Sequence, residues 1–150
     1  MRRFEIVNDK HRKTNSVVKL PTRADKGSAG YDFYSPIDFE IKPNETLIIP
    51  TDVKVKMLTN EVLLLFVRSS IGIKKHIVLS NGTGVIDSTY YSNSDNDGNI
   101  CCALTNIGTE TQVFKAGDRI MQGVFLEYLT TVDDVPINSE RTGGIGSGGR

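Results

Sequence analysis

The stretch VKVKMLTNEVLLLFV, residues 53–67, contains two short apolar segments, residues 53–57 and 62–67, with four residues between them. Apolar runs of this length are typical of β-strands and are too short for most helices. Short apolar segments also occur before and after this stretch. Further short apolar segments span residues 16–20, 31–35, 47–49, 77–79, 100–104 and 120–129. Many short strands at this spacing indicate a β-sandwich or barrel.

Turn-forming residues separate these segments. They are Pro21, Gly30, Pro36, Pro43, Asn44, Pro50, Gly82, residues 96–98 (NDG) and residues 117–118 (GD). Each favours turn geometry that a continuous strand or helix resists. The best helix candidate, Ser69–Lys75, opens with a hydroxyl that can cap it, but Gly72 and its length limit it to a turn or two. We therefore predict an all-β fold with one short helix.

The chain has 150 residues, the usual size of one domain, which is enough to bury a hydrophobic core. Beyond Val135 apolar side chains become sparse and glycines become frequent. Such a composition leaves little to anchor a segment on a core. We therefore expect one domain over residues 1–137 and a flexible glycine-rich C-terminal tail over residues 138–150.

The charge balance and the N-terminus exclude several classes of protein. Lys and Arg number 18, as do Asp and Glu, so no net field attracts the chain to nucleic acid or to an anionic membrane. Residues 1–5 (MRRFE) are polar where a signal peptide has an apolar run. We expect a soluble cytoplasmic protein with no membrane contact and no direct nucleic-acid binding. Cys101 and Cys102 are adjacent in a strand-like run and should point to opposite faces as reduced thiols.

Two stretches carry groups suited to phosphate chemistry. VRSS, residues 67–70, places an arginine and two hydroxyls at a strand-to-helix junction, where they can hold phosphate oxygens. An ordinary helix cap beside a surface arginine explains it equally well. NGTGVIDSTYY, residues 81–91, places Asp87 after a small apolar strand and before two tyrosines, which suits water activation beside a base or sugar. A turn aspartate beside packed tyrosines is the alternative.

The tail and one polar segment imitate known ligand-binding loops. Residues 144–149 match the GxGxxG spacing, but in a dinucleotide-binding fold a helix follows and here only Arg150 does. The tail is either a disordered linker or a lid whose backbone N–H groups and Arg141 wrap a polyphosphate. Residues 93–98 resemble the start of a calcium loop, but Leu104 occupies the position of the bidentate glutamate. We expect a hairpin turn there instead.

Five segments in order resemble the five motifs of the trimeric dUTPase family, closest in style to Gram-positive bacterial and phage members. They are AGYDFY (29–34), RSS (68–70), NGTGVIDSTY (81–90), GDRIMQ (117–122) and RTGGIGSG (141–148). Each motif is moderately specific, but the ordered set is a signature that chance would hardly produce. The resemblance implies a jelly-roll-like distorted β-barrel that forms a homotrimer with shared active sites. It also implies Mg²⁺-dependent hydrolysis of dUTP to dUMP and pyrophosphate.

The resemblance further implies roles for individual residues. Asp87 corresponds to the general base that deprotonates water for attack on the α-phosphorus, and Tyr90 to the platform under the deoxyribose. Asn81 and the hairpin around Gly84 correspond to the groups that read uracil, and Asp32 to the carboxylate that holds magnesium through water. The remaining expected contacts of the substrate are Arg68, Ser69, Ser70, Gln122, Arg141, Ile145, Gly146 and Ser147.

Three departures from the family pattern matter. Ile145 stands where many relatives have a phenylalanine that covers the uracil. Residues 92–99, here called the excursion, are longer and more polar than the usual turn after the motif tyrosine. Thr89 and residues 148–149 (GG) stand where an acidic residue and Thr-Gly are frequent.

Other functions stay open at this point. A dCTP deaminase shares the barrel, but Ala103 aligns with its catalytic glutamate and cannot shuttle a proton. A protein-binding role is a further alternative, because some phage relatives are ligands of repressor proteins and residues 93–99 are a candidate surface for such a partner. A purely structural jelly roll, which would not respond to nucleotide, is the third.

Overall fold

The computed structural model describes residues 1–137 and 143–145, and residues 138–142 and 146–150 lie outside the described residues. Its strands are short, as the apolar segments predict. They are β1 (Arg3–Ile6), β2 (Thr22–Arg23), β3 (Tyr31–Tyr34), β4 (Phe39–Ile41), β5 (Thr46–Pro50), β6 (Val53–Lys56), β7 (Glu61–Phe66), β8 (Ile77–Leu79), β9 (Gly84–Asp87), β10 (Cys101–Asn106), β11 (Gln112–Phe114) and β12 (Arg119–Glu127). None of the described helices is long and apolar enough to cross a membrane.

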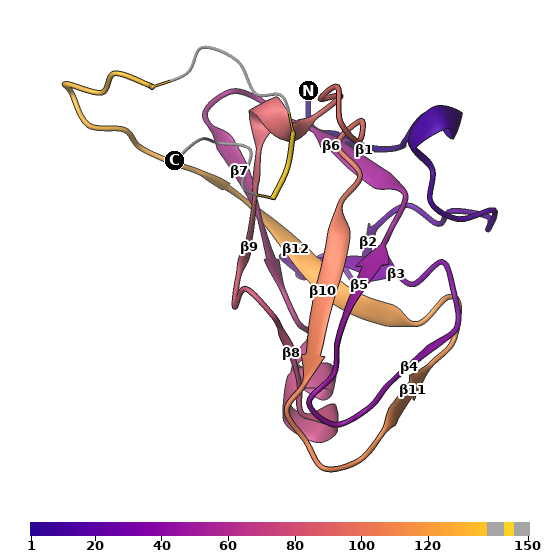
Figure 1. Ribbon diagram of the computed structural model, residues 1–150. Coiled ribbons are helices and arrows are strands. Elements are labelled where there is room, and N and C mark those ends of the chain that lie inside the picture. The colour runs from indigo at the N-terminus through magenta and orange to yellow at the C-terminus, as the bar shows by residue number, and fades with distance from the viewer. Residues whose placement is uncertain (138–142, 146–150) are drawn as a thin grey trace.

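The strands pair in antiparallel fashion throughout and form four sheets among the described residues. The largest has the order β2-β3-β12-β7-β9, and a second has the order β5-β10-β8. The pairs β1-β6 and β4-β11 complete the set. Figure 1 shows the sheets wrapped around one interior, with β4 and β11 at the end away from the N-terminus. The predicted all-β, jelly-roll-like distorted barrel is confirmed.

All of the predicted apolar segments except residues 16–20 lie in strands. Residues 16–20 are not a strand, because Val17 is almost fully exposed and no partner strand among the described residues supplies a ladder. The prediction missed β1, β2, β4 and β11, which have two to four residues each. Strands this short, reading RFEI, TR, FEI and QVF, contain too few alternations to give a periodic signal.

The expected helix at Ser69–Lys75 is present as η2, a π-helical turn over Ser70–Lys74. The backbone N–H groups of Ile71 and Gly72 both donate to the carbonyl oxygen of Arg68 at 3.0 Å. The hydroxyl of Ser69 does not cap the turn, contrary to the expectation. Two further turns, the 3₁₀-helices η1 (Asp9–His11) and η3 (Ser88–Tyr90), were not predicted.

The core lies between the sheets, and one face of each strand is buried in it. In β10 the even-numbered residues Cys102, Leu104 and Asn106 are buried, while the odd-numbered ones are only half-buried. Cys101 and Cys102 therefore face apart as free thiols, as predicted. The largest fully buried apolar side chains are Phe33, Ile41, Leu63, Ile77, Ile100, Leu104, Ile120 and Met121. Burying one such side chain contributes about 1.5–3 kcal/mol to folding.

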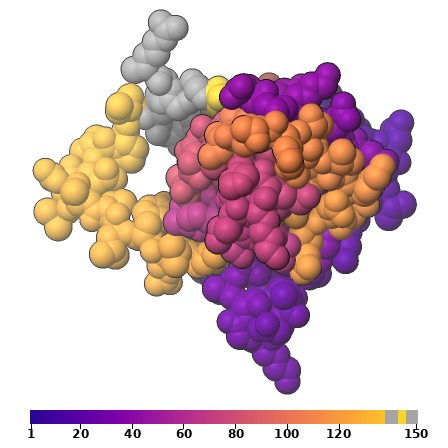
Figure 2. Space-filling model, turned by 90° about the horizontal axis from the view of Figure 1, so that it is seen from below, coloured from indigo at the N-terminus to yellow at the C-terminus, as the bar shows by residue number. Residues whose placement is uncertain are grey.

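The chain becomes exposed towards the end of β12, and the domain boundary expected at residue 137 stays a prediction. Every residue from 126 to 137 is exposed. Figures 1 and 2 show this orange to yellow stretch leading away from the barrel. It nevertheless carries apolar side chains, with Leu129, Val132 and Ile137 each at least 95% exposed.

A buried carboxylate holds three parts of the chain together. Asp52, which follows β5 and is fully buried, accepts hydrogen bonds from the backbone N–H groups of Lys13 and Thr14 at 2.8 and 3.0 Å. It also accepts bonds from the Thr14 hydroxyl at 2.7 Å and from Asn99 Nδ2 at 2.9 Å. Desolvation raises the pKa of this carboxyl, but the hydrogen bonds outweigh it and the net shift is downward.

Replacing Asp52 with Asn should destabilise the fold by about 3 kcal/mol, because an amide cannot accept all of these bonds and leaves buried donors unpaired. For a domain of this size that is a fall in melting temperature of roughly 6–12 °C. A carboxyl with a lowered pKa stabilises the fold above its unfolded pKa of about 4 and loses that contribution as the pH falls further. The difference between wild type and variant, measured by thermal melts from pH 7 to pH 3, should therefore shrink only below about pH 4.

Glu40→Gln is the matched control, since Glu40 is exposed on β4. It should change stability by less than about 0.5 kcal/mol. An Asp52→Asn variant as stable as this control would show that the buried carboxylate is not needed.

Candidate functional site

A pocket of about 580 Å³ opens beside β9 and β10. It is lined by Ile48, Leu65, Leu79, Asn81, Gly84, Val85, Ile86, Tyr90, Asp95, Asn96, Cys101, Ala103, Gly144 and Ile145. Most of these side chains are apolar, and a few carry an amide, a carboxyl or a hydroxyl. Such a lining suits a small ligand with a flat apolar body and a polar edge.

Close approach of β9 to β7 shapes the floor of this pocket. Gly84 is the register partner of Leu65, and a Cβ at Gly84 would lie 2.9 Å from the Cβ of Leu65. Any larger residue there would push the strands apart. Cys101 and Ala103 reach the pocket from β10. Burial, and secondarily Asp52, raises the pKa of the Cys101 thiol, so this wall of the pocket is neutral.

Tyr90 borders the pocket from η3 and is half-buried. Its hydroxyl donates to the carbonyl oxygen of Asn99 at 2.9 Å and accepts a bond from Asn96 Nδ2 at 2.7 Å. The described part of the tail lies against the same ring, because a Cβ at Gly144 would be 3.1 Å from Cε2 of Tyr90. Ile145 also lines the pocket, although it is 95% exposed. Residues 143–145 thus lie where a lid would lie.

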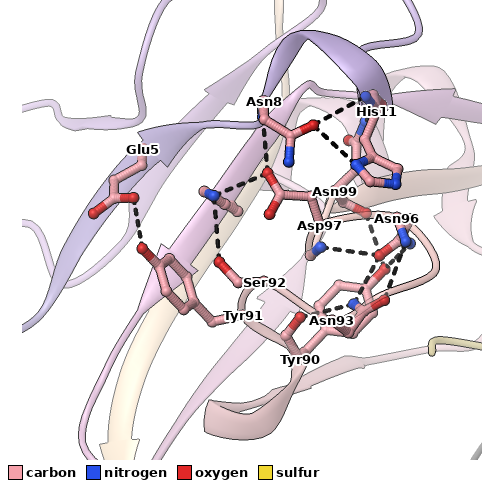
Figure 3. A network of polar contacts seen from close by, with 12 residues as sticks. Glu5, Asn8, His11, Tyr90, Tyr91, Ser92, Asn93, Asn96, Asp97 and Asn99 are labelled. Carbon is pink, nitrogen blue, oxygen red and sulfur yellow. Dashed lines mark hydrogen bonds and ion pairs between the residues drawn. The ribbon is translucent and has the colours of Figure 1, made fainter. Parts of the chain in front are cut away.

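The excursion, residues 92–99, folds back onto the barrel (Figure 3). Asp97 accepts bonds from Lys54 Nζ at 2.9 Å and from the backbone N–H of Asn8 at 2.8 Å. Asn93, Asp97 and Asn99 are all buried. The predicted hairpin turn is wrong, because β9 pairs with β7 while β10 pairs with β5 and β8, so the excursion connects two sheets.

A second group of polar residues, here called the arginine cluster, consists of Asp32, Arg68, Arg119 and Gln122. Arg68 Nε lies 2.9 Å from Asp32 Oδ1, and Arg119 donates from a terminal nitrogen to Asp32 Oδ2 at 3.4 Å. Asp32 is buried, whereas the arginine side chains are 26% and 44% exposed. Two guanidinium groups around one carboxylate leave a net positive charge, which favours an anion such as phosphate.

Strand pairing brings the other predicted phosphate ligands to this cluster. Gln122 is opposite Asp32 in the β3-β12 register and donates from Nε2 to the carbonyl oxygen of Val67 at 3.4 Å. Gly30 allows this packing, since a Cβ there would lie 2.3 Å from Gln122 Oε1. Ser69 and Ser70 follow Arg68 and are exposed. Both serines are therefore accessible to a ligand from solvent.

Asp87 directly follows Ile86, which lines the pocket, and it lies away from the arginine cluster. It is half-buried at the end of β9, and its register partner is Val62 at the start of β7. Arg68 follows the opposite end of β7, beyond Phe66. The strand from Val62 to Phe66 spans roughly 13 Å. A single chain therefore does not gather Asp87 and the arginine cluster around one ligand.

The predicted site residues thus fall into separate groups. Asn81, Gly84, Tyr90 and Ile145 line the pocket. Arg141, Gly146 and Ser147 lie outside the described residues. Prediction from sequence missed Arg119, although the GDRIMQ motif contains it. It also missed Asp95 and Asn96, which the excursion supplies, and the apolar walls, which strands distant in sequence supply.

The fit of the described residues to magnesium depends on the carboxylates that they offer. No cluster of three or more His, Cys, Asp or Glu residues occurs among the described residues. Asp32 is the one carboxylate of the arginine cluster. Magnesium commonly keeps several waters and binds one or two carboxylates together with substrate phosphates. A lone carboxylate beside two arginines fits this mode and does not fit a metal site built from protein ligands alone.

The sequence is similar to known enzymes over nearly its whole length. A family model described as dUTPase matches residues 16–149. The deoxyuridine 5'-triphosphate nucleotidohydrolase of Lactococcus lactis is 39% identical over 150 residues, which cover 99% of this chain and 98% of that protein. The protein of the same name from Haemophilus influenzae is 37% identical over 138 residues, 87% of each chain.

Solved structures agree with these relatives. A dUTPase from Streptococcus mutans has a TM-score of 0.75 and 40% identity, covering 85% of this chain and 97% of its own. A mutant dUTPase from phage phi11 of S. aureus, described as coordinating a structural Mg(II) ion, has a TM-score of 0.71. It covers 93% of this chain and 98% of its own, but at 22% identity the likeness concerns the fold alone. The chain belongs to the dUTPase family, a family of dUTP diphosphatases.

Proposed function

We propose that this protein hydrolyses dUTP to dUMP and pyrophosphate in active sites that are shared between the subunits of a homotrimer. The observation that carries the proposal is the separation of the two groups of site residues. The pocket around Tyr90 suits a pyrimidine nucleoside, and the arginine cluster suits a triphosphate. Asp87, three residues before Tyr90, lies beside the start of β7, whereas Arg68 follows its other end, so we infer that a complete site takes the Asp87 segment of one copy and the arginine cluster of another.

Exposed apolar side chains support self-association. Leu126, Leu129, Val132, Val135 and Ile137 are all exposed on β12 or on the segment that leads away from the barrel (Figure 2). Val85 of β9 and Ile48 of β5, which also border the pocket, are each 57% exposed. Covering these groups with a second copy removes apolar surface from water.

In the proposed reaction Asp87 accepts a proton from water, and the resulting hydroxide attacks the α-phosphorus. The bond from that phosphorus to the α,β-bridging oxygen breaks, and pyrophosphate leaves. Arg68, Ser69, Ser70 and Gln122 hold the phosphate oxygens, and Arg141 joins them from the tail. Magnesium, held by Asp32 through water, would neutralise charge on the triphosphate. The phi11 enzyme is described as coordinating a structural Mg(II) ion, so a protein of this fold can hold the metal.

The pocket accounts for the proposed choice of base and sugar. Asn81, in the turn between β8 and β9, would read the polar edge of uracil, and the narrow floor at Gly84 would exclude larger bases. The face of Tyr90 would support the deoxyribose. Ala103 lies in this pocket and has no ionisable group, which disfavours the dCTP deaminase alternative. Ile145 would cover the base where many relatives have a phenylalanine.

A second role of the excursion in binding a repressor protein stays a prediction. Only Ser92, Ser94 and Asp95 of its side chains are exposed, so a partner would meet a small polar surface.

Pyrophosphate release from dUTP, dCTP, dTTP and UTP in the presence of magnesium tests the proposed function directly. We expect rapid release from dUTP alone. Ammonia release from dCTP without pyrophosphate would assign the chain to the deaminases instead, and no reaction or binding with any nucleotide would favour a structural jelly roll.

Asp87→Asn should lower kcat by at least about 100-fold, because the amide keeps the shape of the side chain but cannot accept the proton. The dissociation constant for dUMP should stay within about tenfold of wild type. Steady-state kinetics and calorimetric titration measure the two quantities separately. Near-normal turnover would exclude Asp87 as the base.

Deleting residues 140–150 should remove most of the hydrolysis and leave the melting temperature unchanged. Among the described residues, the last buried apolar side chain of the core is that of Met121, so we expect the tail to contribute little to stability. Activity depends on Arg141 and on closure of the lid. A truncated protein with full activity would identify the tail as a simple linker.

Mixing two inactive variants tests whether the site is shared. The family resemblance places the tail on a neighbouring subunit, whereas residues 143–145 here lie on the pocket of their own chain. Co-expressed Asp87→Asn and tail-deleted chains should form some sites that take Asp87 from the truncated chain and Arg141 from the other. Those hybrid sites should hydrolyse dUTP well above either variant alone.

Mixed trimers verified by mass that stay inactive would show that each tail serves the pocket of its own chain. A particle that sediments as a monomer would contradict the trimer itself.

A further inference from the structure

The excursion supplies part of the pocket that Tyr90 borders. Asp95 and Asn96 both line it, and Asn96 Nδ2 donates to the Tyr90 hydroxyl at 2.7 Å. The family resemblance gives the excursion no role at the substrate site, because it is where this sequence departs from the usual short turn. Its contacts with Tyr90 therefore call for a physical account.

Tyr90 is held at both ends by the excursion (Figure 3). At the backbone end, its carbonyl oxygen accepts a bond from Asn93 Nδ2 at 2.8 Å. At the other end, its hydroxyl accepts from Asn96 Nδ2 at 2.7 Å and donates to the carbonyl oxygen of Asn99 at 2.9 Å. A phenol has one proton to donate, and the bond to Asn99 uses it. The ring plane is thus fixed from both sides of its hydroxyl.

Asn96 is itself rigidly placed. Its Oδ1 accepts bonds from Asn93 Nδ2 at 2.8 Å and from the backbone N–H of Gly98 at 3.0 Å. Its backbone N–H donates to Asn93 Oδ1 at 3.1 Å. A side-chain amide whose oxygen is already bound presents its N–H group in one direction, and here that direction is the Tyr90 hydroxyl.

The excursion is anchored to the barrel at a distance from the pocket. Asp97 pairs with Lys54 of β6, and Asn99 bonds through its side chain to the buried Asp52. Ser92 and Asp97 both adopt positive φ angles, of 55° and 58°, which the surrounding bonds must maintain. The support of Asn96 is therefore part of the folded barrel and not a feature of a free surface loop.

We propose that Asn96 is a positioning residue that fixes the ring of Tyr90 and so sets the preference of the pocket for a deoxyribonucleotide over a ribonucleotide. This inference rests on the proposed function, in which the Tyr90 face supports the sugar. A ring held in one plane leaves no room for a 2′-hydroxyl, whereas a ring free to tilt can make room. Asn96 acts only through Tyr90 and has no part in the chemistry.

Binding of dUMP and UMP to the whole protein, measured by calorimetry, tests this without depending on turnover. Asn96→Ala should weaken dUMP binding and lower the ratio of UMP to dUMP dissociation constants by about three- to tenfold, the usual effect of one lost hydrogen bond. Tyr90→Phe should lower the ratio similarly. The double variant should be no worse than Tyr90→Phe alone, because the bond that Asn96 makes is already absent.

Ser92→Ala is the matched control. Ser92 lies in the same excursion and accepts a bond from Lys54 Nζ at 3.4 Å, away from the Tyr90 hydroxyl. It should leave the ratio unchanged. If Asn96→Ala does not fold, Asn96→Ser serves in its place, since serine can still accept from the N–H of Gly98 in a turn but is too short to reach Tyr90.

The outcomes separate the inference from the proposed function. A wild-type protein that does not bind dUMP, or does not prefer it to UMP, overturns both. A wild type that prefers dUMP, with Asn96 variants that keep the full preference or lose stability and affinity for both nucleotides equally, overturns the positioning role alone. Additive effects of Asn96→Ala and Tyr90→Phe overturn it as well.

Discussion

The buried carboxylate of Asp52 ties together the parts of this protein on which its pocket depends. It lies at the turn between β5 and β6 and accepts hydrogen bonds from Lys13 and Thr14 of the N-terminal segment. It also accepts a bond from Asn99, at the end of the excursion. An ionised carboxylate without exposure to water is costly unless donors surround it. Only one arrangement of these three segments provides them, so the carboxylate selects that arrangement.

The position of Tyr90 follows from this anchor. Asn99 receives the Tyr90 hydroxyl bond on its carbonyl oxygen while its side chain bonds to Asp52. A change at the turn after β5 can therefore reach the pocket through two hydrogen bonds. The hydrogen-bond network consists almost wholly of asparagine, aspartate and backbone groups. Asparagine and aspartate tolerate positive φ angles, which Asp52 and Asp97 adopt.

Antiparallel pairing explains why Asp87 and the RSS motif, both predicted site residues, lie far apart on one chain. The β7-β9 register places Asp87 beside the start of β7, and the RSS motif follows the end of that strand. Because β7 is fully extended between these points, no side-chain movement can join them. The arginine cluster, in contrast, assembles within one chain, because β3 and β7 both pair with β12.

The sequence by itself determined the fold class, most of the strands, the short helix and the family. The pattern of short apolar segments predicts the strands. The ordered motifs identify the family, because Asp87, Tyr90 and Arg68 each lie in a motif that can be recognised from the neighbouring residues. Strands of two to four residues escaped prediction because they contain too few alternations. The contact of Arg119 with Asp32 escaped prediction for another reason, because the two residues lie on different strands that are far apart in sequence.

The tertiary structure alone decided that the excursion is a wall of the pocket and not a hairpin. Asn93, Asn96 and Asn99 read as turn residues in sequence, because short polar side chains favour turns whatever they contact. Their partners, Tyr90 and Asp52, become neighbours only when two sheets close around the core. Hydrogen bonds between distant segments leave no periodic trace in the sequence, so the geometry that fixes Tyr90 could be found only in the folded chain.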